Sequence, residues 1–442
     1  MQARDQRAFL KSNLALKGLP SLSLTLNIPG YPKSNATVKA FFRYCLRDFK
    51  YFLRARLINI IDFESVEICD AAGDFYLVPF SSGALSIDTV KQHCETFEQD
   101  HPLGRFIDAD LNDQQGNSVS SGKSKICFFC LERPAIDCRR EKTHEAEELR
   151  SFMFPKMEYY CKQKRENEIV KKLSSLALQA ILTEISLTPK PGLIDKLSNG
   201  SHSDMTFNTF LRSTSAISPW FSELVIAGIG FEEHNLSAAL PLIRRIGLRM
   251  ETEMNLSSQN VNTQKGIIFL MGLALFSCGK LFSQSDRFNS IEFRAIILGI
   301  CRNLVRNELY ELVVSGKSHG ADIFLKYGFS GARGEGESGF ETVFKYGLPQ
   351  LEGVNELTDQ ILIKSFLAIA AISNDTNILY RSNHEVLTKF QRLCKIALDD
   401  FNDLNYTAVI DFCKIENISP GGSADLLAVT IFVWLVINTD FS

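Results

Sequence analysis

Two aspartates with strand-like spacing are the first residues of this 442-residue sequence that suggest chemistry. Asp108 and Asp110 lie in the segment HPLGRFIDADL, residues 101–111. On a strand both carboxylates would share one face, about 7 Å apart, close enough to bind one divalent cation. Magnesium held in this way neutralises the charge that develops during phosphoryl or nucleotidyl transfer. A solvent-exposed strand edge would give the same pattern.

A second group contains four potential metal ligands with the spacing Cys-x2-Cys-x7-Cys-x5-His: Cys127, Cys130, Cys138 and His144. Three thiols and an imidazole make a complete tetrahedral zinc set, although the longer gaps are not those of a standard zinc finger. Reduced, partly buried thiols without a metal are the alternative. Basic residues are interleaved here and would either hold a diphosphate or triphosphate or form a solvated helix face. They are Arg133, Arg139, Arg140 and Lys142.

The third group lies in LTPKPGLIDKLSNGSHSDM, residues 187–205. An amphipathic pattern precedes this segment, and Pro189 and Pro191 end the helix that the pattern predicts. The glycines at 192 and 200 let the chain turn. We therefore expect a shaped polar loop between apolar helices, although an ordinary surface connection would look similar. Its reactive side chains are Lys190, Asp195, His202 and Asp204.

Four further polar joints separate predicted helices: 262–266, 318–320 together with 331–339, 375–377 and 419–425. Lys265 opens an apolar helix, whose free backbone donors favour a phosphate. The glycine-rich segment 331–339 is predicted to be a loop that carries Arg333 and Glu335. Ser423 is predicted to cap the last helix, with Asp425 in its first turn. Each joint alone has a capping or turn explanation, but together they predict one shared site at one end of a helical bundle.

The elements that must position these groups divide the chain into two predicted domains. Residues 1–162 predict an α+β, nucleotidyltransferase-like domain, with helices over 3–15 and 84–98 and strands over 21–28, 57–61, 65–69, 75–78 and 106–111. The charged segment KQKRENE, residues 162–168, is predicted to be a joint. Residues 163–442 predict an all-α helical bundle. Its helices are expected over 168–186, 206–229, 236–256, 264–283, 289–313, 359–373, 384–401 and 423–438.

The composition is that of an ordinary globular protein, with 45% hydrophobic and 22% charged residues. A net charge of −3 argues against a nucleic-acid binder, which needs a basic face. The apolar runs 266–278 and 426–438 are shorter than the ~20 residues of a membrane span and predict buried core helices, so no membrane association is expected. Eleven cysteines and a charged N-terminal segment predict a reduced, cytoplasmic protein.

The first domain resembles a known family in four places: ARDQRA at 3–8, LTLNIPGYPKS at 24–34, HPLGRFIDADL, and the Cys/His run up to residue 144. The family is the apo-citrate lyase phosphoribosyl-dephospho-CoA transferases. This resemblance implies transfer of a phosphoribosyl-dephospho-CoA group to a serine of the citrate lyase acyl carrier (gamma) subunit, with release of diphosphate. Asp108 and Asp110 would then be catalytic and bind Mg²⁺. The substrate-binding residues would be Lys33, Arg105, Arg139 and Arg140. A module that only docks the carrier is the non-catalytic alternative.

The second domain resembles the triphosphoribosyl-dephospho-CoA synthase family, over about residues 170–442. The resemblance is carried by PKPGLIDKLSNGSHSDM, NTQKGIIF, SHG, GARGEGESGF, DTN and SPGGSADLLA. It implies ATP and 3′-dephospho-CoA as substrates. The 2′-hydroxyl of dephospho-CoA would attack C1′ of the ATP ribose, and adenine would leave. An all-α ADP-ribose or nucleoside hydrolase is the alternative, because it also needs carboxylates and a metal around a ribose C1′.

The resemblance and the residue types together suggest roles in the second domain. Asp204 or Glu335 is predicted to act as the base or to stabilise the ribose, while His202, Asp204 and Asp425 are expected near Mg²⁺. The remaining predicted substrate contacts are Lys190, Lys265, Arg333 and Ser423. Gln264 stands where a histidine is usual in that family. Since an amide cannot transfer a proton, no acid or base role is expected there.

Overall fold

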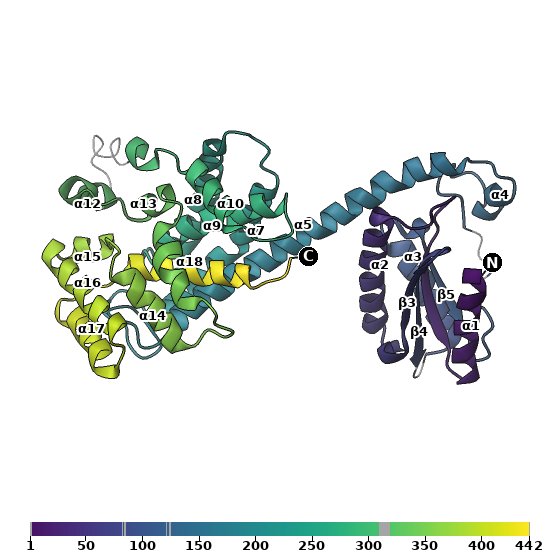
Figure 1. Cartoon of the computed structure of the whole chain (residues 1–442), viewed down its shortest axis with the longest axis horizontal. Coiled ribbons are helices and arrows are strands. Elements are labelled where there is room, and N and C mark those ends of the chain that lie inside the picture. Colours follow the sequence, from purple (N-terminus) through teal and green to yellow (C-terminus); the bar gives the residue numbers. More distant parts are fainter. Residues whose placement is uncertain are drawn as a thin grey trace. The chain divides into compact units, whose positions relative to one another are not determined.

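The computed structural model describes residues 2–441, except 82, 84, 121, 123, 124 and 309–318. Of the elements predicted above, residue 84, residues 309–313 and residue 318 lie outside the described residues. The chain forms two compact units, Met1–Arg165 and Glu166–Ser442 (Figure 1). Helix α5, Ala146–Ser186, contributes residues to both units. The charged segment 162–168 contains the boundary between the two units, but it lies inside a continuous helix and not in a loop. Lys, Arg, Gln and Glu are good helix formers, so a run of them does not interrupt a helix.

The first unit contains an antiparallel sheet in the order β2-β4-β1-β5, with β3 also paired to β4. Its strands are β1 (Ser21–Leu26), β2 (Asn59–Ile60), β3 (Val66–Asp70), β4 (Gly73–Ser81) and β5 (Ile107–Asn112). Its other helices are α1 (Gln2–Leu16), α2 (Ala36–Ala55), α3 (Ile87–Asp100) and the short α4 (Ala135–Arg140). The predicted α+β class is confirmed. Helix α2 was not predicted, although it has a buried apolar stripe and an Asn35 cap that accepts from the Val38 N–H at 2.8 Å.

The two faces of the sheet differ in character. Leu22 and Leu24 of β1, with Ala109 of β5, point into the main core, which α2, α3 and the first turns of α5 complete. On the opposite face, Ser23 pairs with Asp110 and Thr25 with Asp108. A small cluster on that face packs Leu14 of α1 against β4. The strand period therefore places both predicted carboxylates on the face that α1 covers.

The second unit is largely helical, and no strand occurs among its described residues. Its first helices are α6 (Phe207–Ile217), α7 (Phe221–Ile229), α8 (Ala239–Ser257), α9 (Lys265–Phe282) and α10 (Ser290–Ile300). The later ones are α12 (His319–Tyr327), α13 (Gly331–Glu337), α14 (Asp359–Ala370), α15 (Thr376–Arg381), α16 (His384–Asp399), α17 (Asp403–Ile415) and α18 (Gly421–Ile437). The predicted helix 206–229 is interrupted by a 3-10 turn at Ser218–Trp220. Helix α17 was not predicted.

Helix α9 is the core helix of this unit. It is 18 residues long and apolar enough by composition to cross a membrane, but 78% of it is buried within the protein. A Cβ atom added at Gly228 of α7 would lie 2.1 Å from the carbonyl oxygen of Phe276, and one at Gly279 would lie 2.4 Å from that of Val225. These glycines let α7 and α9 pack backbone against backbone.

Two local predictions in the second unit are wrong. Residues 331–337, predicted as a glycine-rich loop, form helix α13, because packing against its neighbours offsets the low helix propensity of glycine. Ser423 does not cap α18, which begins at Gly421. The capping carboxylate comes from Asp375, which accepts from the Ser423 N–H at 2.8 Å and the Asn377 N–H at 3.0 Å. One buried aspartate thus joins the starts of α15 and α18.

Candidate functional site

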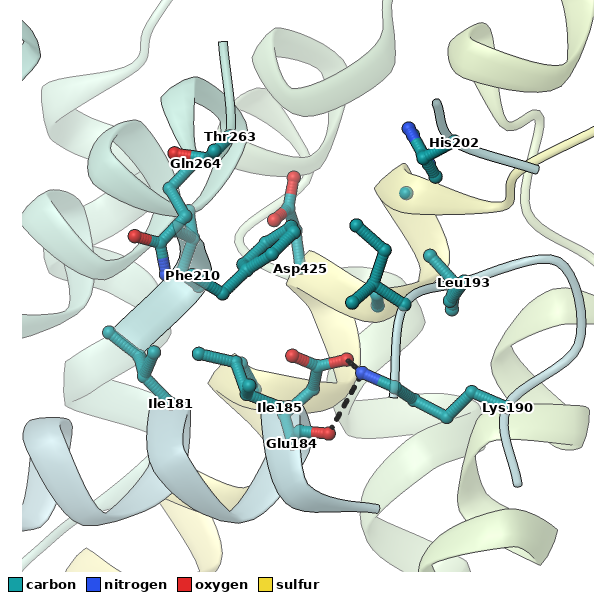
Figure 2. A pocket seen from close by; sticks show the side chains of 15 residues that line it. Ile181, Glu184, Ile185, Lys190, Leu193, His202, Phe210, Thr263, Gln264 and Asp425 are labelled. Atoms are coloured by element: carbon teal, nitrogen blue, oxygen red, sulfur yellow. Dashed lines mark hydrogen bonds and ion pairs between the residues drawn. The ribbon is translucent and has the colours of Figure 1, made fainter. Parts of the chain in front are cut away.

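A pocket in the second unit is formed by the end of α5, the loop 187–206, Phe210 of α6, and the first turns of α9 and α18 (Figure 2). Of the residues predicted from the sequence, Lys190, His202 and Asp425 line it. Glu184, Thr263 and Gln264 supply further polar atoms, and aliphatic side chains such as Ile181 and Ile185 supply the rest. Segments more than 200 residues apart therefore meet at one place.

The loop 187–206 is held in shape by its own buried aspartate. Asp195 accepts from the backbone N–H groups of Lys190 at 2.9 Å, and of Leu197 and Ser198 at 2.8 Å each. Gly192 has φ of +66°, and a Cβ atom there would lie 2.2 Å from the carbonyl oxygen of Ile418. Only glycine allows that conformation and that approach to the α17–α18 connection. Asp195 is therefore a structural residue of the loop.

Lys190 forms a buried ion pair with Glu184. Its Nζ donates to Glu184 Oε1 at 2.8 Å and to the Glu184 carbonyl oxygen at 3.1 Å, as Figure 2 shows. The exposed fractions are only 6% for Lys190 and 7% for Glu184. The ammonium group predicted to bind phosphate is therefore already neutralised. Glu184 was missed, although a glutamate between Ile181 and Ile185 on an apolar helix stripe is a signal that a charge is buried.

Removing one member of this pair should destabilise the protein strongly. We expect Lys190→Met to lower the free energy of unfolding by about 3–5 kcal/mol, because it leaves the Glu184 carboxylate buried without a partner. The double variant Lys190→Met with Glu184→Gln should recover much of that loss. Urea unfolding followed by circular dichroism measures both, with the exposed Lys196→Met as control. Equal stability of Lys190→Met and the control would contradict the ion pair.

His202 is held as a neutral hydrogen-bonding group. Its Nδ1 lies 3.1 Å from Nη2 of Arg381, and its Nε2 lies 2.8 Å from Ser419 Oγ. Arginine only donates, so Nδ1 accepts and Nε2 carries the proton that is donated to the serine. Burial, followed by the charge of Arg381, lowers the pKa of His202. Asp204 lies 3.6 Å from Nδ1, but its side chain is 55% exposed and does not line the pocket.

Asp425 reaches the pocket from α18 and lies against the N-terminus of α9. A Cβ atom added at Gly266 would lie 1.9 Å from Asp425 Oδ2, so this glycine leaves room for the carboxylate beside the first turn of α9. Burial, followed by the nearby charges of Glu184 and Asp375, raises the pKa of Asp425 well above its usual range. A carboxylate with a raised pKa in a cleft is suited to accept a proton near neutral pH.

Gln264, at the start of α9, is fixed by two hydroxyl groups of α6. Its Oε1 accepts from Ser213 Oγ at 2.5 Å, and its Nε2 donates to Thr214 Oγ1 at 2.9 Å. Both ends of the amide therefore have partners, and only 4% of the residue is exposed. The amide holds the N-terminus of α9 against α6.

The remaining predicted residues of this unit do not line the pocket. Lys265 pairs with Glu251 of α8 at 3.5 Å, and Arg333 pairs with Glu308 at 2.8 Å. Glu335 accepts hydrogen bonds from Thr342, and burial raises its pKa. Ser423 Oγ donates to Asp375 at 3.0 Å. The expectation that all the polar joints converge on a single cavity is therefore too broad, because several of these charges have local partners.

In the first unit, the carboxylate pair lies beside several lysines. Lys125 Nζ is 3.3 Å from Asp108 Oδ1 and 2.5 Å from Glu98 Oε2. Burial, followed by the charge of Asp108, raises the pKa of Asp110. Burial lowers the pKa of Lys11 of α1, and the nearby charges of Asp110 and Asp108 partly offset this effect. Two interacting carboxylates with oxygen ligands on one face fit a divalent cation.

A cationic cluster surrounds Lys33 in the same unit. Burial, followed by the charges of Arg139, Arg4 and Arg150, lowers the pKa of Lys33. Residues 31–36 and Lys39 line a pocket at the N-terminus of α2. The three arginines do not line this pocket, but their charges act on Lys33, and a group of cations of this kind is suited to a polyphosphate. The other predicted contacts, Arg105 and Arg140, are exposed and do not line this pocket.

The predicted Cys/His group is brought together. The ligand atoms of Cys127, Cys130, Cys138 and His144 all lie within 4.8 Å of one another, and they can hold a metal ion. A hydrogen bond from the backbone N–H of Glu132 to the sulfur of Cys130 lowers the pKa of this thiol to about 6.

Comparisons with known proteins match both units. Residues 170–440 match the family model described as ATP:dephospho-CoA triphosphoribosyl transferase. Residues 1–160 match the model described as Apo-citrate lyase phosphoribosyl-dephospho-CoA transferase. The two matches show that this chain is a bifunctional transferase. Its α+β unit carries the carboxylate pair, and its helical unit carries the pocket with Asp425. The chain belongs to the ATP:dephospho-CoA triphosphoribosyl transferase family and carries the second family's domain at its N-terminal side.

Relatives with the same fusion support this assignment. The chain is 30% identical to Protein CitXG of Leuconostoc mesenteroides subsp. cremoris, over 94% of this chain and 91% of the relative. It is 29% identical to Protein CitXG of Haemophilus influenzae, over 98% of this chain and 94% of the relative. Over 62% of this chain it is 36% identical to the 2-(5''-triphosphoribosyl)-3'-dephosphocoenzyme-A synthase of Pectobacterium atrosepticum, covering 91% of that protein.

Both sequence resemblances are thereby confirmed. The protein is a triphosphoribosyl-dephospho-CoA synthase, with ATP and dephospho-CoA as substrates. It is also a phosphoribosyl-dephospho-CoA transferase that acts on apo-citrate lyase.

Proposed function

We propose that the pocket of the second unit holds the reacting centre of the synthase, with Asp425 as the general base. The carrying observation is a carboxylate of raised pKa that lies in a pocket beside the N-terminus of α9. Asp425 takes the proton of the 2′-hydroxyl of dephospho-CoA as the oxygen–C1′ bond forms. The C1′–N9 bond breaks, and adenine leaves with the electron pair and takes up a proton. Before it takes the proton, the negative carboxylate also stabilises the positive charge that develops on the ribose as the bond to adenine weakens.

The pocket has a volume of about 60 Å³, well below the ~300–1,000 Å³ of typical ligand pockets. We therefore place only the ribose and its bond to adenine there, with the triphosphate outside. The lining residues offer little positive charge, because Lys190 is paired with Glu184 and His202 is neutral. Magnesium would supply the missing countercharge on the triphosphate.

For the transferase we propose that Asp108 and Asp110 form the centre of a nucleotidyltransferase-like site. The two carboxylates would hold Mg²⁺, and the cationic cluster around Lys33 would bind the diphosphate that leaves. The serine of the acyl carrier (gamma) subunit attacks phosphorus, its oxygen–phosphorus bond forms, and the bond to diphosphate breaks. An oxygen of Asp110 that does not bind the metal takes the serine proton. We also propose a cytoplasmic location, where both substrates and reduced cysteines occur.

Both halves can be tested in one incubation of the full chain with apo acyl carrier subunit, ATP, dephospho-CoA and Mg²⁺. Mass spectrometry should show the carrier increased by one phosphoribosyl-dephospho-CoA group. Chromatography should show adenine release only when dephospho-CoA is present. Adenine or ribose products formed without dephospho-CoA would instead indicate a hydrolase. Unchanged turnover with EDTA in place of Mg²⁺ would refute the proposed metal requirement.

A further inference from the structure

We propose that Cys127, Cys130, Cys138 and His144 hold a structural zinc ion that builds part of the transferase site. The four ligand atoms lie within 4.8 Å of one another. The sulfurs of Cys130 and Cys138 are 3.7 Å apart. Two sulfurs bound to one tetrahedral zinc at about 2.3 Å would be about 3.8 Å apart. This pair of sulfurs therefore already has the spacing of a zinc site, and the other two ligand atoms lie close by.

Two tight turns bring the halves of this ligand set together. In the first, the Leu131 N–H donates to the Cys127 carbonyl oxygen at 3.1 Å, and Leu131 has φ of +59°. In the second, the Thr143 N–H donates to the Cys138 carbonyl oxygen at 3.0 Å, and Lys142 has φ of +52°. A left-handed conformation is unfavourable at a residue other than glycine. Metal coordination would offset both costs.

The imidazole of His144 also points to a metal. Its Nε2 is buried and finds no hydrogen-bond partner among the described residues, and the side chain of His144 lies beside the thiol of Cys130. The edge of the Phe129 ring lies against this imidazole, with the centroids 4.9 Å apart. A buried ring nitrogen without a partner is unfavourable, and a bond to zinc would remove that cost.

The zinc would be structural because protein atoms fill all four positions and leave none open for a substrate. Its role in transfer rests on the site proposed above. The Ala135 N–H, within the zinc loop, donates to the Lys125 carbonyl oxygen at 2.7 Å, and the ammonium of Lys125 pairs with Asp108. Arg139 follows Cys138 directly, and its charge lowers the pKa of Lys33. The metal therefore positions Lys125 and Arg139 beside the proposed carboxylate pair and cationic cluster.

Elemental analysis of the full chain, purified without chelators from zinc-containing medium, tests the proposal. We expect one zinc per chain, and X-ray absorption should show three sulfur ligands and one nitrogen ligand. Cys130→Ala should hold less than a tenth of the zinc, His144→Cys should keep it, and the exposed Cys69→Ala is the control. A full chain that contains no zinc and takes up no Co²⁺ would overturn the metal site.

Activity separates the metal site from its proposed role. Cys130→Ala should lower transfer to the carrier at least tenfold, while adenine release by the second unit stays within twofold. Protease protection of the first unit, compared with that of Cys69→Ala, shows whether the unit that carries the substitution is still folded. Loss of zinc with full transfer would support the metal site but refute its positioning role. Zinc content does not depend on turnover, so it also separates this proposal from a failure of the proposed transferase chemistry.

Discussion

Replacing Asp425 by asparagine should lower the rate of dephospho-CoA-dependent adenine release by about 10²–10⁴-fold, the usual contribution of a general base. The asparagine keeps the shape of the side chain but cannot take a proton. Adenine release measured by chromatography gives the rate. The exposed Asp411→Asn on α17 is the matched control. Asp204→Asn should change the rate only slightly, since its side chain is exposed and lies outside the pocket lining. The reverse order of these two effects would show that Asp204 is the base.

The same variant should melt at the same temperature as the parent chain or higher. Burial raises the pKa of Asp425 in the folded state, so the folded state binds this proton more tightly than the unfolded state. The free energy of unfolding therefore falls as pH rises from the ordinary aspartate pKa to the raised one. At neutral pH Asp425→Asn removes this cost. A clear drop in melting temperature would instead indicate that the carboxylate stabilises the fold.

Activity and pH are connected through the same group. A base works only when it is deprotonated, so the rate of adenine release should fall on the acid side as pH drops through the raised pKa of Asp425. This fall in rate should occur at a higher pH than it would for a base with an ordinary carboxylate pKa. A profile that stays flat down to the ordinary aspartate range would contradict the assignment of Asp425.

Replacing both Asp108 and Asp110 by asparagine should lower transfer to the carrier subunit by at least about 100-fold, because the variant lacks both the proposed metal ligands and the base. Adenine release by the second unit should not change. Transfer is measured by mass spectrometry of the carrier, with triphosphoribosyl-dephospho-CoA supplied. Glu67→Gln, an exposed carboxylate on the same sheet, is the control.

Carrier binding by the double variant decides between the two functions considered for the first unit. A catalytic unit should still bind the carrier but not modify it. Transfer at the parent rate would mean that the carboxylate pair is not the catalytic centre. Loss of binding with unchanged unfolding behaviour would mean that these residues contact the carrier directly.

Much of the fold could be predicted because the relevant signals are local. The alternation in Ser21–Leu26 predicted the strand, whose Leu22 and Leu24 lie in the main core, and Ile181 and Ile185 marked the buried stripe of α5. The failures have local causes as well. The charged residues 162–168 contain the boundary between the units but form continuous helix, and the glycines of α13, predicted as a loop, pack as a helix.

The sequence by itself determined the α+β and helical classes, the order of the family motifs and the Cys/His ligand set, because periodicity and spacing are properties of neighbouring residues. Only the tertiary structure decided which charges are available for chemistry. It paired Lys190 with Glu184, gave Lys265 and Arg333 other partners, and left Asp425 in the pocket. The physical reason is that pairing and pKa depend on burial and on neighbours in space, which chain order does not specify.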